Sequence, residues 1–196
     1  MSRALKKSFY NREPVIVARE LLGKVFVRKI DGVILKGRIV ETEAYLSKGD
    51  EAAHGFKGRT RRNESLYKEA SHAYVHAMRQ YFLLDLVTES RDVPSSVLIR
   101  AVEPTEGIDL MKAFRRSEIL EDLASGPSKF CMAFGITKEF DGFDTTKSNA
   151  PFFVVESDDR KGDFQIENSG RIGISRATDA PLRFWIKGSP FVSKSR

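Results

Sequence analysis

Two carboxylates and a phenol alternate along one short stretch of the sequence. Glu41, Glu43 and Tyr45 stand two residues apart in a segment rich in β-branched residues, and side chains two apart on a β-strand lie on the same face. The plainest interpretation is a solvent-exposed face, because charged residues are mostly exposed. His54 and a basic loop follow directly, however. A carboxylate, an aromatic ring and a histidine beside cationic side chains suit a site for an aromatic ring joined to phosphate.

Arg100 interrupts an otherwise apolar strand. The residues around it, 97–102, favour burial, and a buried guanidinium needs a partner of opposite charge or a cavity. The spacing leaves open whether Arg100 forms a structural ion pair or one that serves catalysis.

The remaining histidines do not indicate a metal site. His72 and His76 are four residues apart, a spacing that brings two ligands together only on a helix. The β-branched and aromatic residues between them predict a strand instead, and no third ligand is near, so we expect no metal. The sequence also contains no P-loop, dinucleotide-binding or nucleophile-elbow pattern.

The composition is that of a globular protein. Of 196 residues, 41% are hydrophobic and 31% charged, which favours one folded domain. The single cysteine, Cys131, indicates a reducing compartment. The net charge of +6 favours a polyanionic partner, although many proteins this basic bind no nucleic acid. No apolar run approaches the ~20 residues of a membrane span, and the N-terminus lacks a signal-peptide core. We therefore expect a soluble intracellular protein.

Turn signals and hydrophobic periodicity predict the elements that would position these residues. Asp31-Gly32 is a strong hairpin signal, and Pro and Gly mark helix ends. We expect helices at residues 14–22, 64–69, 105–116 and 127–135. We expect a hairpin over 24–46, a long loop over 47–72, and further strands at 73–89, 95–103, 152–156, 171–175 and 182–187. Strands dominate without regular β-α alternation, which predicts an α+β domain built on antiparallel strands.

Five blocks of the sequence closely resemble the alkyladenine, or 3-methyladenine, DNA glycosylases. They are ARELLGK (18–24), GRIVETEAYLSKGDEAAH (37–54), VLIRAVEPTEG (97–107), SGPSKFCMAFGI (125–136) and PLRFWIKGSPFVS (181–193), in the family's order. The resemblance implies a single α+β domain over residues 1–196. Its mainly antiparallel, curved sheet with flanking helices would be similar to the C-terminal domain of formyltransferases.

The resemblance also implies a function. Family members are monofunctional enzymes of base excision repair: they flip a damaged nucleotide out of double-stranded DNA, and water attacks the sugar. Carried over, Glu43 is the general base, Arg100 its partner, and the carbonyl of Ile172 completes the water site. Tyr45 and His54 contact the flipped base. No metal or cofactor is implied, and we expect an intracellular monomer, in the cytoplasm or nucleoid of a prokaryote or in the nucleus of a eukaryote.

The chain departs from the family around the base pocket. The family has a tyrosine where this chain has His76, a tyrosine-bearing wedge where it has Met78-Arg79-Gln80, and an asparagine where it has Asp85. Met78 and Arg79 are alternatives for the wedge that fills the gap left by the flipped nucleotide. An ionised Asp85 only accepts hydrogen bonds. We therefore expect a preference for cationic lesions, such as 3-methyladenine and 7-methylguanine, over neutral hypoxanthine or ethenoadenine.

Two other functions stay open at this point. The departures at the wedge leave room for a DNA-damage-binding module of the same fold with little or no excision. A formyltransferase-like RNA-binding domain is a more remote alternative. In each case the basic side chains of the loop and of the 105–116 helix are candidates for phosphate contacts: Lys57, Arg59, Arg61, Arg62, Lys112, Arg115 and Arg116.

Overall fold

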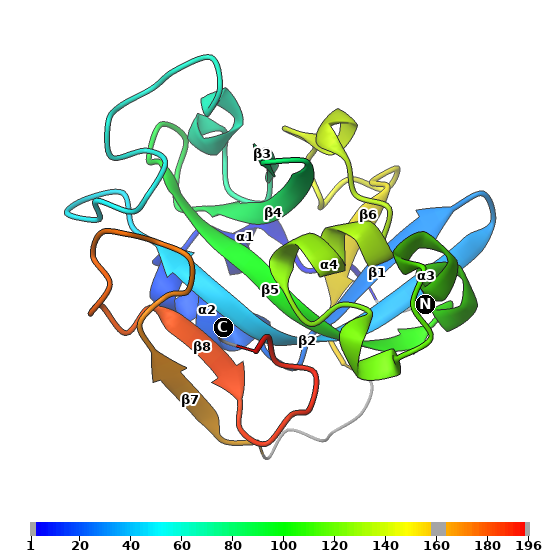
Figure 1. The fold of residues 1–196 in the computed structure, drawn as a ribbon. Coiled ribbons are helices and arrows are strands. Elements are labelled where there is room, and N and C mark those ends of the chain that lie inside the picture. Colours follow the sequence, from blue (N-terminus) through cyan, green and yellow to red (C-terminus); the bar gives the residue numbers. More distant parts are fainter. Residues whose placement is uncertain (1–2, 158–163, 195–196) are drawn as a thin grey trace.

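The computed structural model describes residues 3–157 and 164–194, whose strands form one curled antiparallel sheet (Figure 1). The described strands are β1 (Val25–Ile30), β2 (Val33–Tyr45), β3 (Ala73–Met78), β4 (Tyr81–Thr88), β5 (Ser95–Glu106), β6 (Phe152–Val155), β7 (Ile166–Ser169) and β8 (Arg183–Ile186). Their order is β3-β4-β5-β2-β1-β6, and β8 joins β7 to β2.

The long strand β2 is the centre of this sheet. It follows β1 through the predicted turn at Asp31-Gly32, where both residues have positive φ, 45° and 83°, as the tight hairpin turn requires. One edge of β2 pairs with β1 and then, from Glu41 to Glu43, with β8; its other edge pairs with β5. The part of β2 that carries the two carboxylates is therefore covered on both edges.

Two irregularities in the pairing of β2 with β5 lie beside these carboxylates. Ile39 pairs with Val102 and Glu41 with Ala101, so Val40 is an extra residue on β2. Thr42 then pairs with Ile99, so Arg100 is an extra residue on β5. Such bulges bend a strand and redirect side chains. Here they bring Arg100 to the side of the sheet that carries Glu41 and Glu43.

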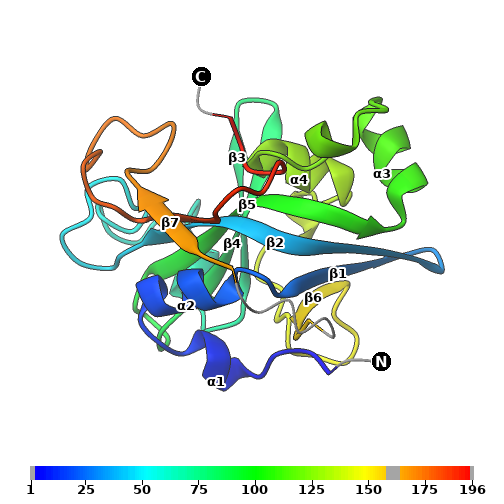
Figure 2. The same cartoon turned by 90° about the horizontal axis from the view of Figure 1, so that it is seen from below.

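Helices cover both faces of the sheet (Figure 2). The helices α1 (Lys7–Tyr10) and α2 (Pro14–Leu21) lie on one face, and α3 (Ile108–Arg115) and α4 (Pro127–Ala133) on the other. Short 3₁₀ turns η1 (Glu64–Tyr67), η2 (Leu120–Asp122) and η3 (Lys138–Phe140) lie in the connections. The ring of Phe26 in β1 contacts those of Phe130, Phe134 and Phe152 at centroid distances of 5.0–5.4 Å. Among the described helices, none is long and apolar enough to cross a membrane.

Three expected elements were wrong in detail. Residues 73–89 form two strands, because the chain reverses after Met78 through Arg79, which has a φ of 57°. The predicted helix at 105–116 begins only at Ile108, because β5 continues to Glu106, which pairs with Lys36.

Residues 171–175 are not a strand, and β7 lies at Ile166–Ser169 instead. The N–H of Ile172 donates to a side chain rather than to a neighbouring strand, and Gly173 has a φ of 79°. The fold class itself, α+β with a curved antiparallel sheet and flanking helices, is confirmed. The likeness to the formyltransferase domain stays a prediction.

Candidate active site

One face of the sheet forms the floor of a pocket of about 580 Å³. Most of the strand residues that line it alternate along three strands, in keeping with the two-residue period of a strand. They are Tyr74, His76 and Met78 of β3, Leu83 and Asp85 of β4, and Ser96, Leu98 and Arg100 of β5. Loop residues 52–63 and residues 172–174 form the walls. Residues far apart in the sequence thus converge on one cavity.

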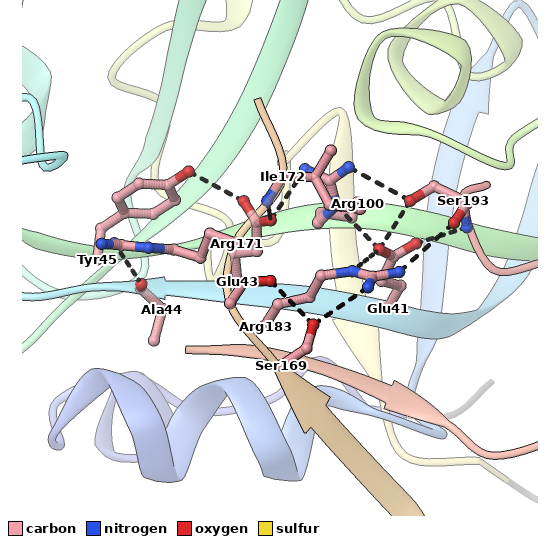
Figure 3. Close-up of polar contacts among 11 residues, drawn as sticks. Glu41, Glu43, Ala44, Tyr45, Arg100, Ser169, Arg171, Ile172, Arg183 and Ser193 are labelled. Carbon is pink, nitrogen blue, oxygen red and sulfur yellow. Dashed lines mark hydrogen bonds and ion pairs between the residues drawn. The ribbon is translucent and has the colours of Figure 1, made fainter. Parts of the chain in front are cut away.

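Glu43 lies directly beneath this pocket, with its side chain 0% exposed. Its Oε1 accepts the N–H of Ile172 at 2.9 Å and lies 3.1 Å from Nη1 of Arg100. Its Oε2 accepts the hydroxyl of Tyr45 at 2.9 Å (Figure 3). All three partners line the pocket. The structure therefore brings together the four residues that the family resemblance assigned to the reaction and its immediate surroundings.

Burial governs the charge of Glu43. Loss of solvent raises the pKa of this carboxyl above its ordinary value, and the nearby Glu41 adds to that effect. Arg100, the N–H of Ile172 and the Tyr45 hydroxyl act against it, because each favours the ionised form. A carboxylate with a raised pKa, held by two hydrogen bonds and an ion pair, is a stronger base than an exposed one, as general base catalysis near neutrality needs.

Glu41 holds the other side of Arg100. Its Oε1 accepts from Nε of Arg100 at 3.0 Å and from Nε of Arg183 at 2.6 Å. The N–H and the hydroxyl of Ser193 each donate to the same carboxylate at 2.7 Å. Although burial opposes its charge, the two carboxylates raise the pKa of Arg100, which keeps its proton. Arg100 therefore bridges two buried carboxylates, and the segment near Ser193 helps to fix it.

A second buried ion pair supports the pocket wall. Arg171 donates to both oxygens of Asp50 at 2.6 and 2.7 Å and to the carbonyl of Ala44 at 3.1 Å. The two side chains are 0% and 1% exposed. Burial opposes the ionised form of Asp50, but Arg171 and the N–H groups of Leu46 and Ala52 prevail and lower its pKa. This pair ties the loop after β2 to the segment that carries Ile172.

Sequence reasoning missed Arg183, Ser193, Asp50 and Arg171. A signal was present for Arg183, which stands at the start of the apolar strand β8 and directly after Leu182, much as Arg100 stands among apolar residues in β5. Asp50, Arg171 and Ser193 lie in loops, where a charged or polar residue is ordinary.

The pocket contains two histidines in contact. Nδ1 of His54 lies 2.8 Å from the Tyr74 hydroxyl, and the His54 and His76 ring centroids are 4.5 Å apart. Nε2 of His76 lies 3.0 Å from Oδ2 of Asp85. Partial burial and the neighbouring His76 lower the pKa of His54, while Asp85 opposes this shift. The four predicted pocket residues Tyr45, His54, His76 and Asp85 thus line the same cavity.

The two wedge candidates lie at the tip of the β3–β4 hairpin. Met78 is 47% exposed at the rim of the pocket, and Arg79 forms the turn beside it. Met78 is therefore the apolar side chain at this rim, and Arg79 is the adjacent charge.

The predicted phosphate contacts separate into two groups. Lys57 and Arg62 line the pocket, Arg59 is paired with Glu64 and Asp92, and Arg61 is exposed nearby. Helix α3 and its end, with Lys112, Arg115 and Arg116, lie at the opposite end of the sheet from this loop (Figures 1 and 2). Lys112 pairs there with Glu118, and Arg115 with Asp122. Of the two groups, only the loop group lies at the pocket.

No cluster of three or more metal-ligating side chains occurs in residues 3–157 and 164–194. The site is instead a buried carboxylate beneath an aromatic-lined cavity with basic side chains at its edge. A family model described as methylpurine-DNA glycosylase matches residues 8–190. The chain belongs to the methylpurine-DNA glycosylase family.

Close relatives agree with this family. A protein of Clostridium perfringens strain SM101 is 45% identical over 97% of this chain and 98% of its own length. A protein of Methanoculleus marisnigri is 43% identical over 97% of this chain and 98% of its own length. A protein of Staphylococcus saprophyticus is 41% identical over 96% of this chain and 93% of its own length. All three are named "Putative 3-methyladenine DNA glycosylase". The resemblance found in the sequence is confirmed, and the family places the chain among the DNA glycosylases, which are hydrolases of DNA repair.

Proposed function

We propose that this chain removes alkylated purines, 3-methyladenine and 7-methylguanine among them, from double-stranded DNA by hydrolysing the N-glycosidic bond. Glu43 is the general base, and no covalent intermediate with the enzyme forms. The observation that carries the proposal is the buried Glu43 carboxylate, held by Tyr45, Arg100 and Ile172 beneath a pocket large enough for a base. The names of the relatives support 3-methyladenine as a substrate.

The hydrogen bonds of Glu43 leave acceptor sites unoccupied. A carboxylate offers about four such sites; the N–H of Ile172 occupies one on Oε1 and the Tyr45 hydroxyl one on Oε2, and Nη1 of Arg100 forms an ion pair with Oε1. Because Arg100 lies against Oε1, we place the attacking water at the free site of Oε2. The carbonyl of Ile172 accepts no hydrogen bond from the described residues and serves as the second acceptor for that water.

The reaction then proceeds by displacement at the sugar. The bond from C1′ to the base nitrogen lengthens, and its electron pair goes to the base as positive charge develops on the sugar. Glu43 stabilises this charge and takes a proton from the water, whose oxygen bonds to C1′. A base that is already cationic leaves as a neutral molecule, which lowers the barrier. Arg100 keeps Glu43 ionised and in place until the proton is transferred.

The pocket is suited to a flipped, positively charged base. The rings of Tyr45, His54, Tyr74 and His76 line it, and aromatic faces attract cations. Asp85 places a carboxylate among them, with 4% of its surface exposed. We therefore propose a preference for cationic lesions over hypoxanthine. Equal excision of hypoxanthine and 3-methyladenine would contradict it.

The β3–β4 hairpin and the basic loop would hold the DNA. We propose that Met78 enters the space that the flipped nucleotide leaves, with Arg79 against the backbone, because apolar side chains commonly serve as wedges. Arg59, Arg61 and Arg62 contact phosphates around it. The protein acts as a monomer, with residues 1–196 as one glycosylase domain.

A direct assay tests the enzyme against the alternative of a damage-binding module. A duplex treated with a methylating agent is incubated with the protein, and alkali then cleaves the strand at each abasic site. We expect cleavage that depends on methylation and on the protein. Tight binding to the same duplex without abasic sites would favour the binding module. Tighter binding to transfer RNA than to damaged duplex would favour the RNA-binding alternative.

A further inference from the structure

His76 is held from several sides within the pocket. Its ring stacks on Tyr74 at a centroid distance of 5.0 Å and an angle of 24°, and the edge of His54 lies against it at 4.5 Å. Its Nε2 is 3.0 Å from Oδ2 of Asp85, whose Oδ1 accepts the Ser96 hydroxyl at 2.9 Å. Rotating the ring would break the contact with Asp85, so these neighbours fix which nitrogen faces the carboxylate.

This arrangement sets the positions of donor and acceptor on His76. A neutral imidazole carries one N–H donor and one bare nitrogen acceptor. An ionised carboxylate only accepts, so a neutral His76 whose Nε2 lies 3.0 Å from Oδ2 of Asp85 carries its proton on Nε2. Nδ1 is then the bare acceptor. Nδ1 makes no hydrogen bond with the described residues. It is also not one of the side-chain polar atoms among them that are fully buried without a hydrogen-bond partner.

We propose that Ser96, Asp85 and His76 form a chain that makes Nδ1 of His76 an acceptor for the exocyclic amino group of a flipped adenine lesion. The pocket thereby favours purines with an amino group at position 6, such as 3-methyladenine, over those with an oxo group there, 7-methylguanine among them, because an oxo oxygen would face a second acceptor. This selection rests on the proposed function and adds to it. Asp85 favours a positively charged base, while His76 recognises the exocyclic group at position 6 of that base. Lesions methylated at the same nitrogen but differing at position 6 therefore test this hydrogen bond.

The test compares two bases that are methylated at N7 and differ at position 6. A duplex that contains hypoxanthine is methylated, and the release of 7-methyladenine and 7-methylhypoxanthine is measured by mass spectrometry under single-turnover conditions. At about pH 8, above the ordinary range of an imidazole, and with each rate divided by that base's uncatalysed release, we expect the wild type to release 7-methyladenine at least about tenfold faster, since an unpaired buried polar group is costly. His76→Phe keeps a ring against Tyr74 but removes Nδ1, so the ratio should fall towards one.

His72→Phe is the matched control. His72 lies outside the pocket lining, with Nδ1 against the carbonyl of Glu69, and its replacement should leave the ratio unchanged. A wild-type ratio near one, or an unchanged ratio in His76→Phe, overturns the inference while the excision itself stands. If the wild type releases no methylated base, the proposed function fails instead.

A spectroscopic measurement on the wild type does not depend on either variant folding. The ¹⁵N chemical shifts of the three histidines distinguish a protonated from a bare imidazole nitrogen. We expect His76 to carry its proton on Nε2. A proton on Nδ1 would contradict the inference.

Discussion

Alanine in place of Asp50 would leave the Arg171 guanidinium buried without its carboxylate. The pair is 0% and 1% exposed, and Asp50 receives two of the three hydrogen bonds that Arg171 donates. Nε of Arg171 already has no partner among the described residues, so one hydrogen bond, to the carbonyl of Ala44, would remain. Removing one member of a buried ion pair costs about 3–5 kcal/mol. We expect a loss of that size in the free energy of unfolding.

Urea denaturation, followed by fluorescence, measures this loss. With an m-value of about 2 kcal/mol per M, a loss of ~3–5 kcal/mol lowers the midpoint by ~1.5–2.5 M. The double variant Asp50→Leu with Arg171→Met removes both charges and keeps apolar volume. It should therefore recover most of the loss, since apolar replacements of buried pairs are often neutral. A change below about 1 kcal/mol in Asp50→Ala would refute the view that this pair is a tight, desolvated contact.

Three further outcomes follow from the charges around the pocket. The pKa of Asp50 is below its ordinary value of 3.8, so its ionised form stabilises the fold above that pH. This contribution is lost as the pH falls from about 3.8 towards the folded-state pKa. Over this pH range the urea midpoint of Asp50→Asn should therefore fall less than that of the wild type. An equal fall in the two proteins would contradict this prediction. Tyr45→Phe removes a donor that stabilises ionised Glu43, so the acid limb of kcat/KM against pH should move to higher pH; an unmoved limb would contradict this. Arg62→Ala should reduce the slope of log binding constant against log salt concentration by about the amount of one phosphate contact, whereas Arg116→Ala at the far end of the sheet should leave that slope unchanged. Equal slopes in the two variants would show that the loop does not hold DNA.

The strand arrangement was largely predictable, because its signals are local. Asp31-Gly32 specifies a hairpin turn, and alternation along β2 placed Glu41, Glu43 and Tyr45 on one face; contacts of both carboxylates with Arg100 confirm it. The apolar surroundings of Arg100 correctly predicted a buried, paired guanidinium.

The contacts that complete the site were not predictable, because they join segments that are far apart in the sequence. No local pattern in Met78-Arg79-Gln80 marks a turn, so one strand was expected where two exist. The resemblance assigned the carbonyl of Ile172 to the site, but the N–H of the same residue contacts Glu43. The contact of Ser193 with Glu41 joins residues 152 positions apart, and neither composition nor periodicity reports such a pairing.

The central claim is that Glu43 acts as the base. Glu43→Gln keeps the size of the side chain and removes its ability to take a proton. Single-turnover excision of a methylated base is measured together with binding to the same duplex. Glu13→Gln, an exposed position at the start of α2, is the control. We predict that Glu43→Gln binds the lesion as the wild type does but loses at least about 10²–10⁴-fold in excision rate, while Glu13→Gln loses none. Excision by Glu43→Gln within about tenfold of the wild type would contradict the account and transfer the role to another group, with Glu41 the nearest carboxylate.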